Sequence, residues 1–284
     1  MAYGRPYRVS SRLRYNSYPM SAFLQKLEAA TKRNDSMLCI GLDPDPKLMP
    51  EMPVAKFLCD IVEATKDLVC AYKPNFAFFE AMGLDGWRAL QEVMRVMAKD
   101  VVTIADAKRG DIGNTSAAYA KATFEVWGFD VATVAPYMGY DSVQPFIDYK
   151  DKGVLILCRT SNPGSADFQN LNAGGRPLFE QVALKANEWN KHKNIGLVTG
   201  ATHPDELKRV RELCPDLPLL IPGVGAQDGD LVASVKAGLD AKGGGIIVSS
   251  SREVLYASKG RDFAQASRKV AERLRAEIQQ AAKA

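Results

Sequence analysis

The sequence contains only two histidines and five cysteines, and the cysteines are scattered without paired spacing. Because histidine and cysteine are the usual ligands of zinc, this sparse set argues against a zinc cluster. An odd number of cysteines without a disulfide pattern is typical of reduced thiols, and we therefore expect a cytoplasmic protein. These residues are His192, His203, Cys39, Cys59, Cys70, Cys158 and Cys214.

The chain also lacks a long apolar run and a strong excess of one charge. No stretch approaches the roughly 18 apolar residues that a membrane-spanning helix needs, so we expect no membrane association. The net charge is +4, and the four arginines among residues 1–19 equal that whole excess. The remainder of the chain is therefore near neutral, which argues against a nucleic-acid-binding surface.

Residues 1–19 have no apolar periodicity, and Met20 is followed by Ser21-Ala22-Phe23, which resembles a natural start. We predict that residues 1–19 form a disordered extension. Their arginine-rich, acid-free composition leaves a targeting peptide as the alternative. No tract rich in proline, glycine or serine divides the rest, so we predict a single domain over residues 20–284.

From residue 36 onward, short apolar runs alternate with amphipathic stretches, which predicts an α/β protein with a parallel sheet. Eight such units in about 250 residues fit a single (β/α)₈ TIM barrel, with the active site at the carboxyl ends of the strands. The alternative is a doubly wound open sheet, but that fold has a glycine-rich turn after its first strand, and here that strand ends in Gly41-Leu42-Asp43-Pro44-Asp45. The predicted strands are Met37–Leu42, Cys70–Lys73, Val101–Ala105, Val131–Ala135, Val154–Cys158, Gly196–Thr199, Leu217–Ile221 and Gly245–Val248. The predicted helices include Ala55–Val69, Trp87–Lys99, Thr115–Trp127, Leu178–Lys191 and Phe263–Ala281.

The third strand, Val101–Ala105, runs directly into charged residues. Side chains two positions apart share a face of a strand, so Asp106 and Lys108 are predicted to point the same way. Gly110 allows the backbone to turn, and Asp111 follows on the exit loop. Buried opposite charges are costly unless they pair or take part in chemistry. This stretch therefore indicates an enzyme.

Other predicted strands also end in polar residues that would meet at the same rim. Asp43 follows the first strand and Lys73 ends the second. The loops after the seventh and eighth strands are rich in glycine and serine, with Arg252 nearby. In barrels of this kind those two loops usually bind phosphate.

Taken together, these motifs resemble the orotidine 5′-phosphate decarboxylase family, in particular its longer bacterial branch. The spacing D-x-K-x-x-D is weak evidence alone, but the matching blocks follow the family's order from residue 39 to residue 256. They are Ile40–Pro44, Lys73–Asn75, Asp106–Thr115, Arg159–Gly164 and Pro222–Gln227. The resemblance implies a homodimer with shared active sites that converts orotidine 5′-phosphate to uridine 5′-phosphate and CO₂, the last step of de novo pyrimidine biosynthesis. It implies neither cofactor nor metal.

The resemblance also implies roles for individual residues. Lys73, Asp106, Lys108 and Asp111 match the family's charged array, in which Lys108 would protonate C6 of the pyrimidine. Asp43 and Lys73 would contact the ribose, and Ser161 would contact the pyrimidine. The positions on the phosphate side are Pro222, Gln227 and Arg252. Those that would reach the partner subunit's site are Asp111, Ile112 and Thr115. The chain departs from shorter relatives at Ser251, where they have glycine.

A few positions and functions have alternatives. Thr115 could instead be the N-cap of the following helix. A Mg²⁺-dependent sugar-phosphate lyase or aldolase on the same barrel is the nearest rival function, but it would need a carboxylate in place of Lys73. A Schiff-base aldolase needs a lysine that loses its proton readily, which flanking carboxylates oppose. A non-catalytic phosphate-binding barrel would not need buried alternating charges.

Overall fold

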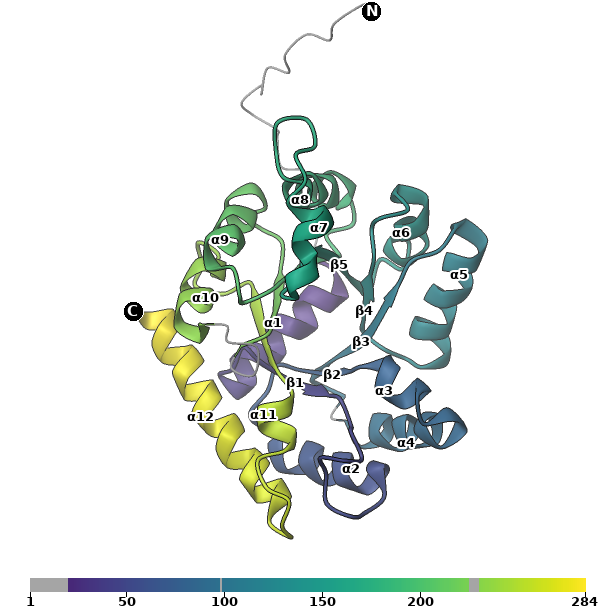
Figure 1. Cartoon of the computed structure of the whole chain (residues 1–284), viewed down its shortest axis with the longest axis vertical. Helices are drawn as coiled ribbons and strands as arrows, with labels where there is room; N and C mark the ends of the chain where they lie inside the picture. Colours follow the sequence, from purple (N-terminus) through teal and green to yellow (C-terminus); the bar gives the residue numbers. More distant parts are fainter. Residues whose placement is uncertain (1–19, 98, 225–229) are drawn as a thin grey trace, which may run out of the picture.

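The computed structural model describes residues 20–97, 99–224 and 230–284. Eight parallel strands close into a barrel in chain order, with the last strand pairing with the first through Leu38 and Val248. Helices surround this barrel (Figure 1), which confirms the predicted (β/α)₈ fold over the open-sheet alternative. The strands are β1 (Leu38–Leu42), β2 (Ala71–Pro74), β3 (Val102–Arg109), β4 (Val131–Val134), β5 (Gly153–Arg159), β6 (Ile195–Thr199), β7 (Leu219–Pro222) and β8 (Ile246–Ser250).

The helices follow the strands as the sequence predicts, with shifts at their ends. The helix predicted over Ala55–Val69 ends at Thr65, and the one predicted over Trp87–Lys99 begins earlier, at Gly83. The α-helices are α1 (Ala22–Asn34), α2 (Val54–Thr65), α3 (Phe76–Glu80), α4 (Gly83–Val96), α5 (Gly113–Lys121), α6 (Tyr140–Ile147), α7 (Ala166–Gln169), α8 (Leu178–Trp189), α9 (Pro204–Leu213), α10 (Leu231–Gly238), α11 (Arg252–Leu255) and α12 (Phe263–Lys283). A π-helix, η1 (Ala122–Val126), extends α5, and a 3₁₀ turn, η2 (Pro163–Ser165), precedes α7.

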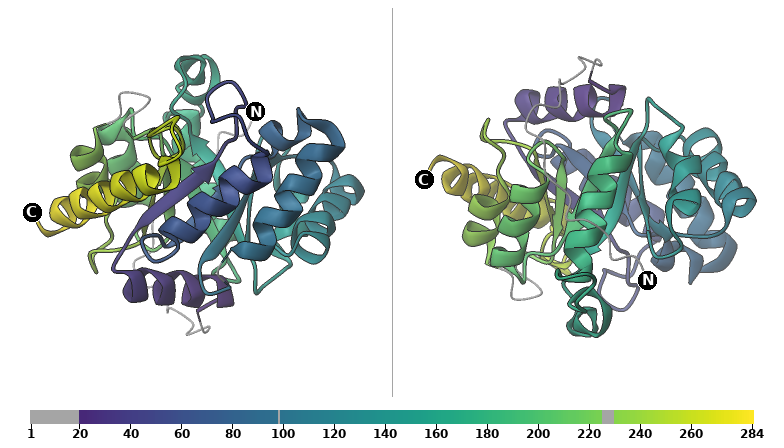
Figure 2. Two further views of the ribbon diagram at one scale, coloured as in Figure 1. Left: turned by 90° about the horizontal axis from the view of Figure 1, so that it is seen from below. Right: turned by 90° about the horizontal axis from the view of Figure 1, so that it is seen from above.

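The apolar core has two parts because the strands are covered on both faces. One part fills the layer between the barrel and the surrounding helices. The other lies inside the barrel, where Phe23 and Leu27 of α1 pack with strand residues such as Val102 and Leu155. Figure 2 shows α1 lying across one end of the barrel. The amino-terminal end of the barrel is thus closed by α1, which leaves the carboxyl ends of the strands for a site.

Gly153, the first residue of β5, permits this closure. A Cβ atom at this position would lie 2.7 Å from the ring of Phe23, which is closer than packed carbon atoms approach. The absence of a side chain at Gly153 therefore lets α1 pack directly against the strand.

Among the described residues, no helix is both long and apolar enough to cross a membrane.

Candidate active site

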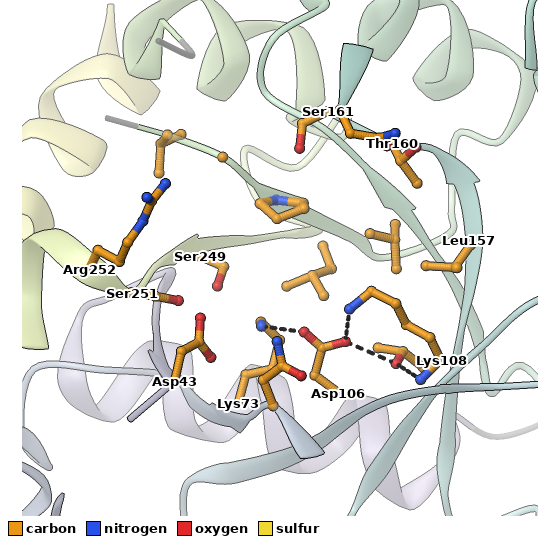
Figure 3. Close-up of a pocket in the computed structure, with 18 residues that line it drawn as sticks. Asp43, Lys73, Asp106, Lys108, Leu157, Thr160, Ser161, Ser249, Ser251 and Arg252 are labelled. Carbon is orange, nitrogen blue, oxygen red and sulfur yellow. Dashed lines mark hydrogen bonds and ion pairs between the residues drawn. The ribbon is translucent and has the colours of Figure 1, made fainter. Parts of the chain in front are cut away.

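A cavity of about 450 Å³ opens at the carboxyl ends of the strands, opposite α1. Every strand contributes to it, either by its last residues or by the segment that follows. Figure 3 shows the charged side chains spread along the cavity, with Lys108 near one end and Arg252 near the other. The lining residues are Asp43, Lys73, Asn75, Asp106, Lys108, Thr133, Leu157, Thr160, Ser161, Asn162, Val198, Leu220, Pro222, Gly223, Val224, Ser249, Ser251 and Arg252.

Asp106 lies between two lysines. Its Oδ2 atom is 2.7 Å from Nζ of Lys73, and its Oδ1 atom is 2.6 Å from Nζ of Lys108. The side chains of Lys73 and Asp106 are only 6% and 8% exposed, whereas that of Lys108 is 49% exposed. Lys108 is therefore the cation of this cluster that is best placed to reach a molecule in the cavity.

Burial and the neighbouring charges shift the pKa values of the two buried residues, Asp106 and Lys73, in opposite directions. Burial by itself raises the pKa of Asp106, but the attraction of Lys73 and Lys108 outweighs it and holds that pKa well below its usual range. Burial lowers the pKa of Lys73, and the carboxylates of Asp106 and Asp43 more than reverse this effect. Both groups are therefore charged at neutral pH.

The backbone of β3 is irregular where the charged residues lie. Its pairing with β4 shifts between Ala105 and Arg109, and Lys108 has a φ angle of 47°, in the left-handed region. The expectation that Asp106 and Lys108 converge is confirmed by their contact. Their side chains do not meet through the alternation of a regular strand. Instead, a bulge turns the side chain of Lys108 toward the carboxylate of Asp106.

A second group of residues lies toward the opposite end of the cavity, around the segment that follows β1. The hydroxyl of Tyr256 donates a hydrogen bond to the carbonyl of Asp43 at 2.7 Å and accepts one from the N–H of Asp45 at 2.7 Å. Among the described residues, Oδ1 of Asp43 is buried without a hydrogen-bond partner. A carboxylate held in this way can accept a hydrogen bond from a bound molecule.

Ser251 lies against Gly41, and Arg252 begins α11 at the cavity wall. A Cβ atom on Gly41 would come within 1.9 Å of Oγ of Ser251, so the two positions depend on each other sterically. The serine that departs from the pattern of shorter relatives is thus accommodated because Gly41 has no side chain.

Most of the residues predicted for the site line this cavity, and the exceptions fall into two groups. Gln227 lies outside the described residues. Asp111, Ile112 and Thr115 lie beyond the lining that the described part of the chain provides. Oδ1 of Asp111 accepts a hydrogen bond from the N–H of Ile112 at 2.8 Å, and Ile112 is 56% exposed.

Thr115 is not the N-cap of its helix. Helix α5 begins at Gly113, two residues earlier than the sequence suggested, and its N-cap is Ile112, which makes no side-chain capping bond. The capping alternative for Thr115 is therefore wrong, because the helix already includes it.

Several lining residues were not singled out from the sequence. Thr133 is a single threonine in the otherwise apolar strand β4, and threonine is too common in strands to mark a site. Ser249 begins a run of three serines at the end of β8, and that run is the signal that could have identified it. Asn75, Thr160 and Asn162 lie in the blocks that carry the family resemblance, but the sequence alone gives them no individual role. Among the described residues, no group of three or more histidine, cysteine, aspartate or glutamate side chains is arranged to hold a metal ion.

Comparisons with known proteins agree on one family. Residues 36–268 match the model of the "Orotidine 5'-phosphate decarboxylase / HUMPS family". The orotidine 5′-phosphate decarboxylase of Dehalococcoides mccartyi is 53% identical over 258 residues, which cover 89% of this chain and 96% of the relative. That of Cupriavidus necator is 49% identical over 257 residues, covering 88% and 94%. The structure of the Leishmania donovani OMP decarboxylase superposes with a TM-score of 0.80 at 42% identity, covering 91% and 99%.

Proposed function

This chain belongs to the orotidine 5′-phosphate decarboxylase / HUMPS family, and we propose that the cavity described above converts orotidine 5′-phosphate to uridine 5′-phosphate and CO₂. The relatives that match it over most of their length are themselves named decarboxylases of this substrate. The chain is accordingly a carboxy-lyase of pyrimidine biosynthesis. The observation that carries the mechanism is the Lys73–Asp106–Lys108 cluster, in which one cation reaches the open cavity.

The chemistry explains why a fixed cation is needed. When the bond between C6 and the carboxyl carbon breaks, CO₂ leaves and its bonding electron pair stays on C6, where no adjacent group can delocalise it. The ammonium group of Lys108 stabilises this charge as it develops and then transfers a proton to C6. The neutral amine regains its proton from solvent. Apart from this proton, the steps use only groups of the protein and the substrate.

Asp106 and Lys73 support this step without transferring the proton. Asp106 holds Nζ of Lys108 at 2.6 Å, and Lys73 holds the other carboxylate oxygen at 2.7 Å. The buried pair therefore provides a rigid support for the half-exposed lysine. A charge arrangement that is fixed before the reaction needs no reorganisation while C6 becomes negative.

The rest of the cavity suits the other parts of a nucleotide. Asp43 and Lys73 would contact the ribose, and Ser161 the pyrimidine. Pro222 and Arg252 lie on the phosphate side, so that the two ends of the cavity meet the two ends of the substrate. Gln227 would complete the phosphate contacts, although it lies outside the described residues. Contacts with the phosphate, remote from C6, supply binding energy that can be used to close loops and exclude water.

We also propose a homodimer in which Asp111, Ile112 and Thr115 contribute to the site of the partner subunit. Two observations support this arrangement: these residues lie away from the cavity of their own chain, and Ile112 exposes a large apolar side chain. Exposed apolar residues also follow β4, where Tyr137 is 86% exposed. Apolar surface of this kind is typical of a protein–protein interface.

The five cysteines are all free thiols, which supports the proposal of a cytoplasmic location.

A spectroscopic assay of orotidine 5′-phosphate loss, carried out in EDTA, tests the proposal. We expect full activity in the chelator, because Lys73 stands where a Mg²⁺-dependent lyase would need a carboxylate. Lys108→Ala should lower kcat by about 1,000-fold or more, since it removes both the stabilising charge and the proton donor. Circular dichroism should show an intact fold. Activity that requires a divalent cation, or a folded Lys108→Ala variant with more than a few per cent of wild-type activity, would contradict the mechanism.

A further inference from the structure

The hydroxyl of Thr133 lies inside the bulge between β3 and β4, directly beside the catalytic pair. Its Oγ1 atom accepts a hydrogen bond from the backbone N–H of Lys108 at 2.9 Å. The same atom is 3.2 Å from Oδ1 of Asp106 and 3.4 Å from the carbonyl oxygen of Ala105. Thr133 is 1% exposed, so these contacts form without competition from bulk water.

A threonine hydroxyl has one proton to donate and lone pairs with which to accept. The N–H of Lys108 uses one lone pair of the Thr133 oxygen, and the hydroxyl proton of Thr133 remains available for Asp106 or for the carbonyl of Ala105. The contact with Asp106 is the shorter one, and hydrogen bonds to a carboxylate are stronger than those to a neutral carbonyl. One hydroxyl therefore joins the carboxylate of one catalytic residue to the backbone of the other.

The backbone at Lys108 needs such a support. A φ angle of 47° is unfavourable for a residue with a Cβ atom, and it persists only where the surroundings hold it. The shifted pairing with β4 removes the regular ladder at this point, and the Thr133 hydroxyl supplies the acceptor for the Lys108 N–H. Without it, this N–H would lose its partner and the bulge would be free to relax.

We propose that Thr133 is a positioning residue for the decarboxylation, because its hydroxyl fixes the Asp106 carboxylate and the Lys108 backbone in one geometry. This inference rests on the proposed function, in which the Asp106–Lys108 pair acts on C6. Oδ1 of Asp106 then accepts from both Lys108 Nζ and Thr133, while Oδ2 accepts from Lys73. The carboxylate is held from three sides, so the ammonium group that it carries is held as well.

Thr133→Val tests the proposal, because valine keeps the branched shape and removes only the hydroxyl. We expect kcat to fall by about 100-fold, the size of effect that a displacement of about 1 Å at a reacting group can cause. KM and the dissociation constant for uridine 5′-phosphate should change by less than about threefold, since a group that acts only on the chemical step lowers kcat selectively. Thr133→Ser, which restores the hydroxyl, should recover at least a third of the wild-type kcat.

Thr199→Val is the matched control. Thr199 ends β6, is fully buried, and its hydroxyl has no hydrogen-bond partner among the described residues. The same substitution there should leave kcat unchanged. If Thr133→Val does not fold, Thr133→Ala also removes the hydroxyl without crowding its neighbours, and the same loss of kcat is expected.

The possible results separate this inference from the function on which it rests. A wild-type protein that does not decarboxylate orotidine 5′-phosphate would overturn the proposed function and this inference with it. An active wild type together with a fully active Thr133→Val variant would overturn the positioning role alone. Equal losses in Thr133→Val and Thr133→Ser would also overturn it, because the hydroxyl would then not be the group that matters.

Discussion

Asp106 is the residue on which the active-site charges depend, since it contacts both lysines and is itself buried. Removing its charge would leave Lys73 in the protein interior without its closest counter-charge. Breaking a buried ion pair by removing one partner is strongly destabilising, whereas exposed pairs contribute little. Removing the charge of Asp106 should therefore lower the stability of the fold as well as the activity.

We expect Asp106→Asn to lower the free energy of unfolding by about 3 kcal/mol at pH 7. Because the pKa of Asp106 is lowered on folding, its stabilising effect is fully present above the pKa of an unfolded aspartate, about 3.9, and is lost as the pH falls toward the folded value. The difference between wild type and variant should thus be about 1 kcal/mol smaller at pH 3 than at pH 7. Urea unfolding at both pH values measures it.

The exposed pair of Lys56 and Asp60, with Nζ and Oδ2 2.8 Å apart, provides the control. Asp60→Asn should change the free energy of unfolding by less than about 1 kcal/mol. Equal losses in the two variants, or a difference for Asp106→Asn that grows as the pH falls, would contradict the lowered pKa of Asp106.

The residues of the site were only partly predictable, for a physical reason. Charged residues at the end of an apolar strand are conspicuous, so Asp106 and Lys108 could be found from their pattern. The left-handed backbone at Lys108 could not, because lysine is not a residue type that signals that conformation. Thr133 was missed because a single threonine is ordinary in a strand, and its role depends on the bulge opposite it.

At the scale of elements, the strands were predicted to within a few residues because they are buried on both faces. Such strands are nearly continuous apolar runs, which a sequence displays directly. Their carboxyl ends were less predictable, since β3 continues through the charged residues to Arg109, which still pairs with Val134. Helix α5 begins at Gly113 without a side-chain cap, so no capping residue marked its start.

The junction of β8 and α11 is the element expected to recognise phosphate. Arg252→Ala should weaken binding of uridine 5′-phosphate by about 10- to 100-fold, because a charge-assisted hydrogen bond contributes roughly 1.5–3 kcal/mol. Binding of uridine, which has no phosphate, should change by less than about twofold. Isothermal titration calorimetry with the two ligands measures this difference.

Arg261, an exposed arginine that precedes α12, is the control for the loss of a positive charge. Arg261→Ala should leave the affinity for both ligands unchanged. If Arg252→Ala weakens uridine as much as uridine 5′-phosphate, Arg252 acts on the nucleoside or on the fold, and its assignment to the phosphate is wrong.

At the scale of the whole molecule, the two ends of the barrel have different roles: one contributes to stability and the other holds the proposed active site. Helix α1 closes the amino-terminal end with apolar side chains, and the charged cavity occupies the carboxyl end. The segment that carries Asp111 and Ile112 leaves this cavity and exposes apolar surface. A single chain thus presents an incomplete set of the residues proposed for the site, and a two-fold dimer would complete it.

Mixing two inactive variants tests this shared site. If each site combines Lys73, Asp106 and Lys108 of one chain with Asp111 of the other, Lys108→Ala and Asp111→Asn should each be nearly inactive as homodimers. When equal amounts are unfolded and refolded together, half of the dimers should be hybrids, and each hybrid has one site with both lesions and one with none. Activity should therefore return to about a quarter of wild type if subunits pair at random.

The pair Lys108→Ala and Asp106→Asn serves as the control for this experiment, because these two residues contact each other within one chain. Every site of that hybrid carries one lesion, so mixing should restore nothing. Native mass spectrometry confirms in both mixtures that hybrids have formed. Recovery to about a quarter for the Asp111 pair alone is the result that only a site built from two chains can produce. Hybrids of that pair that stay inactive would show instead that Asp111 does not complete the partner's site.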